Sequence, residues 1–229
     1  NLTEMKTKSF TLVILAIFGM VIFTNYTSKN TKETDASSLL FMLEEEKLAH
    51  DVYTFLYSKW ETRPFANIKE SEKVHMQKVQ ELLDQNKIPY EILPEGKFKN
   101  QNLQKLYNDL TAKGKVSEIE ALKAGATIED VDIYDLQRLT KETQNQDIAD
   151  VYKFLECASR NHLRAFSRNL EMRNANYVPQ YISKNDYEKI INAEHEQCGL
   201  QNGMQCQNQG KGRGNRGRGN GFGNGNCMN

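Results

Sequence analysis

A carboxylate and an imidazole three residues apart, Glu72 and His75, are the pair in this sequence best suited to chemistry. Residues three apart share one face of an α-helix, so both side chains can point at the same ion. A further carboxylate, Glu46, stands among apolar residues in the preceding stretch. A Glu-x-x-His on one helix and a glutamate on another are half of the ligands of a di-iron carboxylate site. The rest of the chain must supply the other half.

Two later helical stretches each offer one candidate ligand. Glu129 lies at the centre of an apolar pattern, and His162 lies on the apolar side of its own stretch. Carboxylates can bridge two ions, and imidazoles can cap them. We therefore predict a site for one or two iron ions, with the ligands Glu46, Glu72, His75, Glu129 and His162. Asp132 and Glu45 are additional candidate ligands.

A more ordinary interpretation exists for several of these residues. The glutamates at 44–46 form a charge run, and such runs usually face solvent. Glu46 stands seven residues before Tyr53 on the same helical stripe, so we expect it to point inward. His195 lies between two glutamates, and we expect it to be solvated. Tyr53 or Tyr134 could lie close to the site as a hydrogen-bond donor.

Helical periodicity extends over most of residues 37–198, which we predict to be one domain. Pro64 interrupts the pattern, so we expect it to lie between two helices. The helix lengths and connections predict an all-α fold, a ferritin-like antiparallel four-helix bundle with a long crossover between helices 2 and 3 and a short C-terminal helix. The predicted helices cover residues 39–60, 67–86, 102–113, 117–143, 147–173 and 183–198.

The two ends of the chain differ in composition from its middle. The formal net charge of zero divides into +1 for residues 1–35, +4 for residues 198–229 and −5 for the residues between. Residues 10–24 are apolar and too few to span a bilayer comfortably, but they suit a signal peptide. We predict that residues 1–36 are a signal peptide, or a retained membrane anchor, with a linker. The protein would then be exported or membrane-anchored, on the extracytoplasmic side.

The C-terminal tail, residues 199–229, is of low complexity and holds ten of the 14 glycines. Such a composition offers little to bury, so we expect disorder. Its four cations would hold phosphates weakly, and we do not expect nucleic acid as a partner. Among the cysteines, Cys157 fits a helical core position, and export would permit a disulfide between Cys198 and Cys206.

Four stretches within residues 39–195 carry a resemblance to a known family: EEEKLAHDVY (44–53), FANIKESEKVHM (65–76), ALKAGATIEDVDIYDL (121–136) and SRNHLRAF (159–166). Through them the chain resembles the ferritin-like family catalogued as domain of unknown function 2202. The resemblance implies the fold of the rubrerythrin and ferritin superfamily. It also implies a ligand pattern of a glutamate on helix 1, Glu-x-x-His on helix 2, a glutamate on helix 3 and a second Glu-x-x-His on helix 4.

The chain departs from that pattern at its fourth helix. Ser159, and not a glutamate, stands three residues before His162. One ion could be lost, Asp132 could replace the missing carboxylate, or water could fill the gap. Because buried like charges repel, we also expect Glu72→Ala to lower metal content with little harm to folding.

Two functions remain open on this basis. The first is a metal-binding, ferritin-like protein of the cell envelope, redox-active toward dioxygen or peroxide; if it is an enzyme, it would be a di-iron-type oxidoreductase. The alternative is a non-enzymatic helical scaffold or interaction module with a degenerate or empty metal site, which Ser159 favours. The expected partners are the metal ion, a second copy in a homodimer, and a membrane only through the N-terminal segment.

Overall fold

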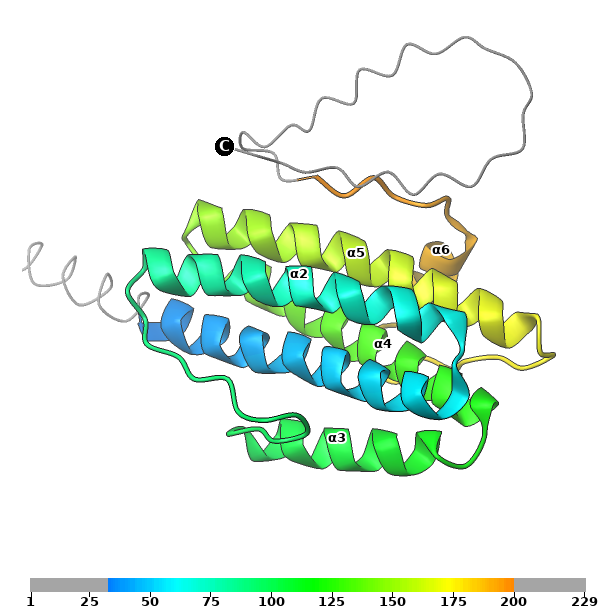
Figure 1. Cartoon of the computed structure of the whole chain (residues 1–229). Coiled ribbons are helices and arrows are strands. Elements are labelled where there is room, and N and C mark those ends of the chain that lie inside the picture. Colours follow the sequence, from blue (N-terminus) through cyan, green and yellow to red (C-terminus); the bar gives the residue numbers. More distant parts are fainter. Residues whose placement is uncertain (1–32, 200–229) are drawn as a thin grey trace, which may run out of the picture.

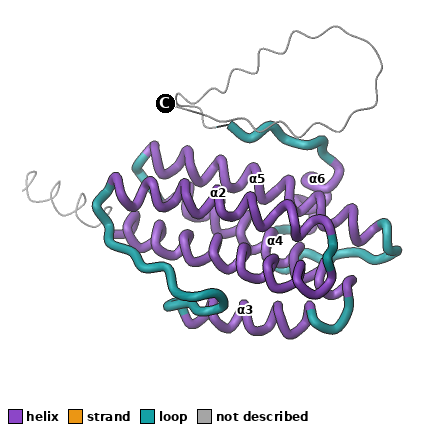
Figure 2. The backbone as a smooth tube through the Cα atoms, in the orientation of Figure 1, coloured by secondary structure: helices purple, strands orange, loops and turns teal. Residues whose placement is uncertain are grey.

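The computed structural model describes residues 33–199, which form six helices and no strands (Figure 2). The expectation of an all-α fold is therefore confirmed for this range. The first helix covers residues 33–60. It is followed by α2 (Arg63–Gln85), α3 (Gln101–Gly114), α4 (Glu118–Glu142), α5 (Gln146–Glu171) and α6 (Lys184–Asn192).

The four long helices pack side by side as a helical bundle (Figure 1). The first helix turns back into α2 through residues 61–62, and α4 turns back into α5 through residues 143–145, so each pair is antiparallel. A long connection containing α3 returns along the outside of the bundle, so that α2 and α4 run in the same direction. The shorter α6 lies against the C-terminal half of α5.

Local sequence explains where two of the long helices begin. The Ser117 hydroxyl accepts a hydrogen bond from the backbone N–H of Glu120 and so caps α4. The Asn145 side chain caps α5 in the same way, through the N–H of Asp147. Both caps lie in the turns before helices that carry candidate ligands, and they help to fix where α4 and α5 start.

Two predicted helix ends need correction. Pro64 does not separate two helices: it lies in the first turn of α2, where a missing N–H costs no hydrogen bond. The turn occurs just before it, where Glu61 adopts a left-handed φ of 50°. The last helix ends at Asn192 instead of residue 198, and the segment after it runs as a non-helical strap along α5.

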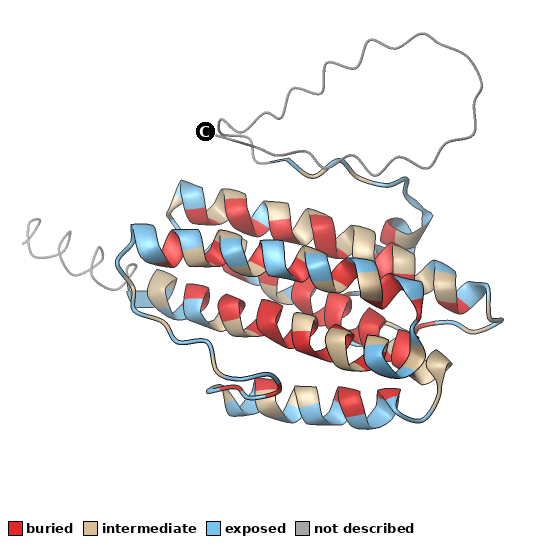
Figure 3. Cartoon of the chain, in the orientation of Figure 1, coloured by how far each residue is buried: buried red, intermediate tan, exposed pale blue. Residues whose placement is uncertain are grey.

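The apolar core consists of two clusters, and buried polar or charged residues lie between them along each long helix. On α2, for example, Phe65 and Ile68 belong to one cluster and Val79 belongs to the other, with Glu72 and His75 between them. The inward faces of all the long helices are buried (Figure 3). The fold therefore places polar side chains at mid-length, with apolar packing toward both ends.

A close approach of two helices occurs at Gly125 on α4. A Cβ atom there would lie 2.4 Å from the Phe166 ring, so only glycine leaves room for that ring. Phe166 packs against Tyr53 and Phe65 with ring centroids 5.4 Å and 5.5 Å away. Gly125 thus allows the aromatic contact beside the buried charges.

No helix within residues 33–199 is long and apolar enough to cross a membrane. The predicted signal peptide or anchor around residues 10–24 lies outside the described residues. So does the glycine-rich tail from residue 200 onward, with Cys206 and Cys227.

Candidate metal centre

The five predicted ligands come together in the middle of the bundle. Glu46 lies on the first helix, Glu72 and His75 on α2, Glu129 on α4 and His162 on α5. Their donor atoms form two groups of three, each within a span of 4.8 Å. Both groups include Glu72, so the two groups are joined at this residue.

The first group consists of Glu46, Glu72 and His75. The Nδ1 atom of His75 lies 2.6 Å from Glu72 Oε2 and 3.1 Å from Glu46 Oε2. On the other side of the ring, Nε2 lies 3.4 Å from the Ser71 hydroxyl oxygen. An imidazole whose Nδ1 bound a metal would donate its second N–H to this hydroxyl, as metal-bound histidines commonly do. The sequence pattern gave no signal for Ser71.

The second group consists of Glu72, Glu129 and His162. The Nδ1 atom of His162 lies 3.1 Å from Glu72 Oε1 and 3.5 Å from Glu129 Oε2. The two imidazole rings stack, with their centroids 5.6 Å apart. Glu72 therefore turns one oxygen toward each imidazole, and this is the geometry of a carboxylate placed between two sites.

Several of the oxygen and nitrogen atoms that could bind a metal in these groups have no hydrogen-bond partner in the described part of the chain. They include Glu46 Oε1 and Glu72 Oε1, and also His162 Nδ1. Although His162 Nδ1 and Glu72 Oε1 are 3.1 Å apart, they are not oriented as a hydrogen bond. Buried polar atoms are nearly always paired, so unpaired atoms that converge call for an explanation. Glu46 Oε1 belongs to the first group, and Glu72 Oε1 and His162 Nδ1 belong to the second, so a cation in each group would satisfy them, and the residues fit a metal.

Burial and mutual charge determine the protonation of these groups. Burial lowers the pKa of each imidazole, but the neighbouring carboxylates outweigh it, raising the pKa of His162 to about 10 and that of His75 well above its usual value. Burial also raises the pKa of Glu46 to about 7, against the effect of His75. Burial raises the pKa of Glu72 as well, but the two neighbouring imidazoles lower it more, so that it lies below the usual range.

Tyr53 holds one ligand in place. Its hydroxyl donates to Glu129 Oε1 over 2.5 Å and also lies 3.3 Å from the backbone oxygen of Gly125. Burial raises the pKa of Tyr53, and the charge of Glu129 adds to this effect. Of the two tyrosines named from the sequence, Tyr53 lies at the site, whereas Tyr134 is exposed.

Asp132 and Glu45, the additional candidate ligands, are buried near the centre but belong to neither group of three. The Ser159 hydroxyl donates a short hydrogen bond to Asp132 Oδ2. Ser159 on α5 thus does not provide a carboxylate ligand, and it binds a carboxylate of α4 through its hydroxyl group instead. His195 is exposed, as expected.

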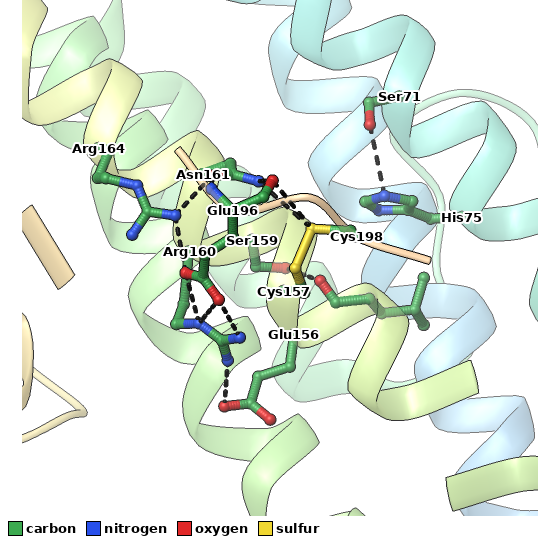
Figure 4. The surroundings of a disulfide bond; sticks show 11 residues. Ser71, His75, Glu156, Cys157, Ser159, Arg160, Asn161, Arg164, Glu196 and Cys198 are labelled. Atoms are coloured by element: carbon green, nitrogen blue, oxygen red, sulfur yellow. Dashed lines mark hydrogen bonds and ion pairs between the residues drawn. A yellow bond between two sulfur atoms is a disulfide. The ribbon is translucent and has the colours of Figure 1, made fainter. Parts of the chain in front are cut away.

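Cys157 lies in helix α5, as the sequence pattern indicated, but the Cys198–Cys206 disulfide that export would permit does not form. Cys157 forms a disulfide with Cys198, across 41 residues of sequence (Figure 4). The strap around Cys198 is also held to α5 by Glu196, which accepts hydrogen bonds from Arg160 and Arg164 at distances down to 2.6 Å. Sequence spacing could not find this pair, because the strap returns to α5 only through the tertiary fold.

Comparison with known proteins finds relatives without an assigned activity. The family model described as "Uncharacterized protein domain (DUF2202)" matches residues 35–194. "Uncharacterized protein MJ0754" of Methanocaldococcus jannaschii is 49% identical over 166 residues, which is 72% of this chain and 90% of that protein. The crystal structure of the hypothetical protein MJ0754 matches with a TM-score of 0.69, over 70% of this chain and 93% of that one.

Proposed function

Because the chain belongs to the DUF2202 family, whose description names no activity, we propose a function from the geometry of its own residues: it binds two iron ions in a ferritin-like carboxylate centre. The observation that carries this proposal is the position of Glu72. Its Oε2 atom lies 2.6 Å from His75 Nδ1, and its Oε1 atom lies 3.1 Å from His162 Nδ1. A carboxylate that serves two groups of donors in this way is suited to bridge two ions.

Each ion would have its own pair of ligands besides Glu72. Glu46 and His75 would hold one, and Glu129 and His162 would hold the other. Oxygen and imidazole donors of this kind suit iron. Four long helices, the crossover between α2 and α4 and ligands from every long helix support the ferritin-like assignment. With Ser159 in place of a fourth carboxylate, the centre has three carboxylates, and the two groups share Glu72.

Iron bound in such a centre can exchange electrons with dioxygen or peroxide, so the proposed activity is that of an oxidoreductase. The protein contributes by positioning the ligands and by excluding water from the centre. Tyr53 fixes the orientation of Glu129, and the apolar clusters on both sides keep solvent away. The side chain of His162 is 12% exposed, against 2% for that of His75. A small oxidant would therefore approach from the His162 side.

The test is the iron content of the purified full-length protein after anaerobic loading with Fe²⁺ and removal of excess metal. We expect two irons per chain. Glu46→Gln should retain about one, and Glu72→Gln should lose most of both because it serves both groups. Glu188→Gln, on the exposed side of α6, is the matched control and should retain two. A parent protein that retains no iron would favour the scaffold instead.

We also propose that the protein works in the cell envelope. The support is the apolar run at residues 10–24, together with the Cys157–Cys198 disulfide, since disulfides persist mainly in oxidising compartments. Alkylation of free thiols in freshly lysed cells tests whether the Cys157–Cys198 disulfide is present in the cell. Cys157 should be protected from the reagent until a reductant is added, and labelling without reductant would contradict the proposal.

A further inference from the structure

Glu45 stands next to Glu46 in the sequence but has a different environment. Its side chain is buried, with 2% of the residue exposed. Neither of its carboxylate oxygens has a hydrogen-bond partner within the described residues. An ionised carboxylate without any donor is costly inside a protein, so either a proton or a cation must neutralise it. The proposed iron ligands do not include Glu45 and do not explain its position.

The groups that face Glu45 are mostly acidic. The charges of Asp132, Asp135 and Glu46 are the acidic ones that act on it most strongly. Arg138 is the cation that acts in the opposite direction, and it is bound to Asp135 at 2.5 Å and to Glu142 at 3.2 Å. Several carboxylates therefore converge from the first helix and α4 with one shared arginine, and this is an environment that attracts a cation.

A surface cavity reaches this cluster from outside. It has a volume of about 400 Å³ and lies between the first helix, α3 and α4. Glu45 lines it, with Asp135 and Asp109. The Asp135 side chain is 14% exposed and that of Asp109 is 48% exposed, so carboxylates are present from the mouth inward. Lys105 also lines the cavity, but it is paired with Asp109 at 2.5 Å.

Asp132 connects Glu45 with the proposed iron centre. Its Oδ1 atom is buried and has no hydrogen-bond partner among the described residues, while its Oδ2 atom accepts from Ser159. After burial, the charges of Glu46 and Glu129 raise its pKa most. Asp132 is thus near enough to interact electrostatically both with Glu45, which lines the cavity, and with two of the proposed iron ligands, Glu46 and Glu129.

We propose that Glu45 and Asp132 form a transit site for a divalent cation on its way from the surface cavity to the metal centre. This inference rests on the proposed function. The site offers carboxylates and no imidazole, so it holds a cation less firmly than the centre, which has two histidines. A cation that keeps part of its water shell enters such a site and leaves it toward the stronger ligands. Ser159 contributes by orienting Asp132.

The experiment follows Co²⁺ loading of the full-length, metal-free protein by stopped-flow absorbance, with final metal content measured after equilibration. Glu45→Gln keeps the shape and removes the charge. We expect it to reach the same final Co²⁺ content as the parent protein, but at least tenfold more slowly. Glu188→Gln, an exposed site on α6, should load at the parent rate. Circular dichroism checks that the variants keep their helix content.

A second variant tests the same route without altering a fully buried group. Asp135→Asn, at the cavity wall, should slow loading about threefold and weaken the dependence of the rate on ionic strength. Parent-like loading rates in both variants would overturn the transit site alone. A lower final content at an unchanged rate would also overturn it, by making Glu45 a ligand of the centre. A parent protein that takes up no Co²⁺ would overturn the proposed function itself.

Discussion

The pKa of Glu72 is set by two opposing effects, burial and the neighbouring imidazoles. Removal from water raises the pKa of this carboxyl group, but the imidazoles of His75 and His162 lower it further, so the ionised form is favoured. The sequence alone suggested that removing this carboxylate would relieve repulsion among acids. The structure favours the opposite outcome, because two imidazoles with raised pKa values lie beside Glu72.

We therefore expect Glu72→Gln to destabilise the metal-free protein at neutral pH. Removing one partner of a buried ion pair leaves the other uncompensated, and the free energy of unfolding should fall by about 3 kcal/mol. Urea denaturation of the metal-free variant measures it. Glu81→Gln, on the exposed face of α2, should change stability by less than about 0.5 kcal/mol. A variant more stable than the parent would mean that repulsion among the acids dominates.

At the same scale, the sequence identified residues by type and spacing but not their neighbours. The Glu-x-x-His spacing and one inward polar residue on each other long helix were enough to find the five residues that converge. The hydrogen-bond partner of Ser159 and the surroundings of Glu45 could not be predicted, because both depend on the register between helices. A carboxylate beside Ser159, such as Asp132, is set by how α4 and α5 pack and not by either helix alone.

Asp130 fixes the segment that follows α5 onto α4. It is fully buried, and its two oxygens accept four hydrogen bonds at 2.6–3.1 Å. The donors are the Tyr177 hydroxyl and the backbone N–H groups of Gln180, Tyr181 and Ile182. A single carboxylate thereby satisfies three successive N–H groups before α6 begins, and it holds the connection against the bundle.

We expect Asp130→Asn to loosen this segment and to lower the free energy of unfolding by about 2 kcal/mol. The amide keeps one accepting oxygen, and its NH₂ group faces N–H donors that it cannot satisfy. Urea denaturation gives the loss, and limited proteolysis should cleave near residues 174–183. Asp186→Asn, at an exposed position in the first turn of α6, is the control. It should neither lower the free energy of unfolding nor make residues 174–183 sensitive to proteolysis. An Asp130 variant as stable and as resistant as the parent would rule out this anchoring role.

The strap after α6 should weaken in acid through Glu196. Hydrogen bonds from Arg160 and Arg164 outweigh burial and lower the pKa of Glu196 to about 2. A carboxyl group with a depressed pKa stabilises the fold above its unfolded-state pKa, about 4.3, and loses that contribution as pH falls toward 2. The melting temperature of Glu196→Gln should therefore lie below that of the parent above pH 5, and the two should converge only as pH falls through 2. A difference that is as large at pH 2 as at pH 5 would contradict this assignment.

At the level of elements, the sequence predicted the long helices better than their ends. The predicted helix over 147–173 agrees closely with α5, Gln146–Glu171, because a strong apolar stripe and a capping Asn145 define it. The pattern failed at Pro64, since proline is compatible with both a break and a first helical turn. It failed again after Asn192, where contacts with α5 replace helical hydrogen bonds.

In the molecule as a whole, buried charge occupies the middle of the bundle, and stability must come from elsewhere. The two apolar clusters lie toward opposite ends, and the strap and the crossover connection attach to the outside of the bundle. Unpaired carboxylates at the centre cost stability in the metal-free protein. A covalent link that restrains the unfolded chain is one way to offset such a cost.

The Cys157–Cys198 disulfide is that link, and we expect its loss to be measurable in the intact protein. It closes a loop spanning 41 residues of sequence. Restricting an unfolded chain by a loop of this length stabilises the native state by about 4 kcal/mol in the chain-entropy account. Dithiothreitol should therefore lower the melting temperature markedly. The double variant Cys157→Ser with Cys198→Ser should melt at the lower temperature with or without the reductant. If the reductant lowered the melting temperature of the double variant by as much as that of the parent, the stabilisation would come from other thiols and not from this bond.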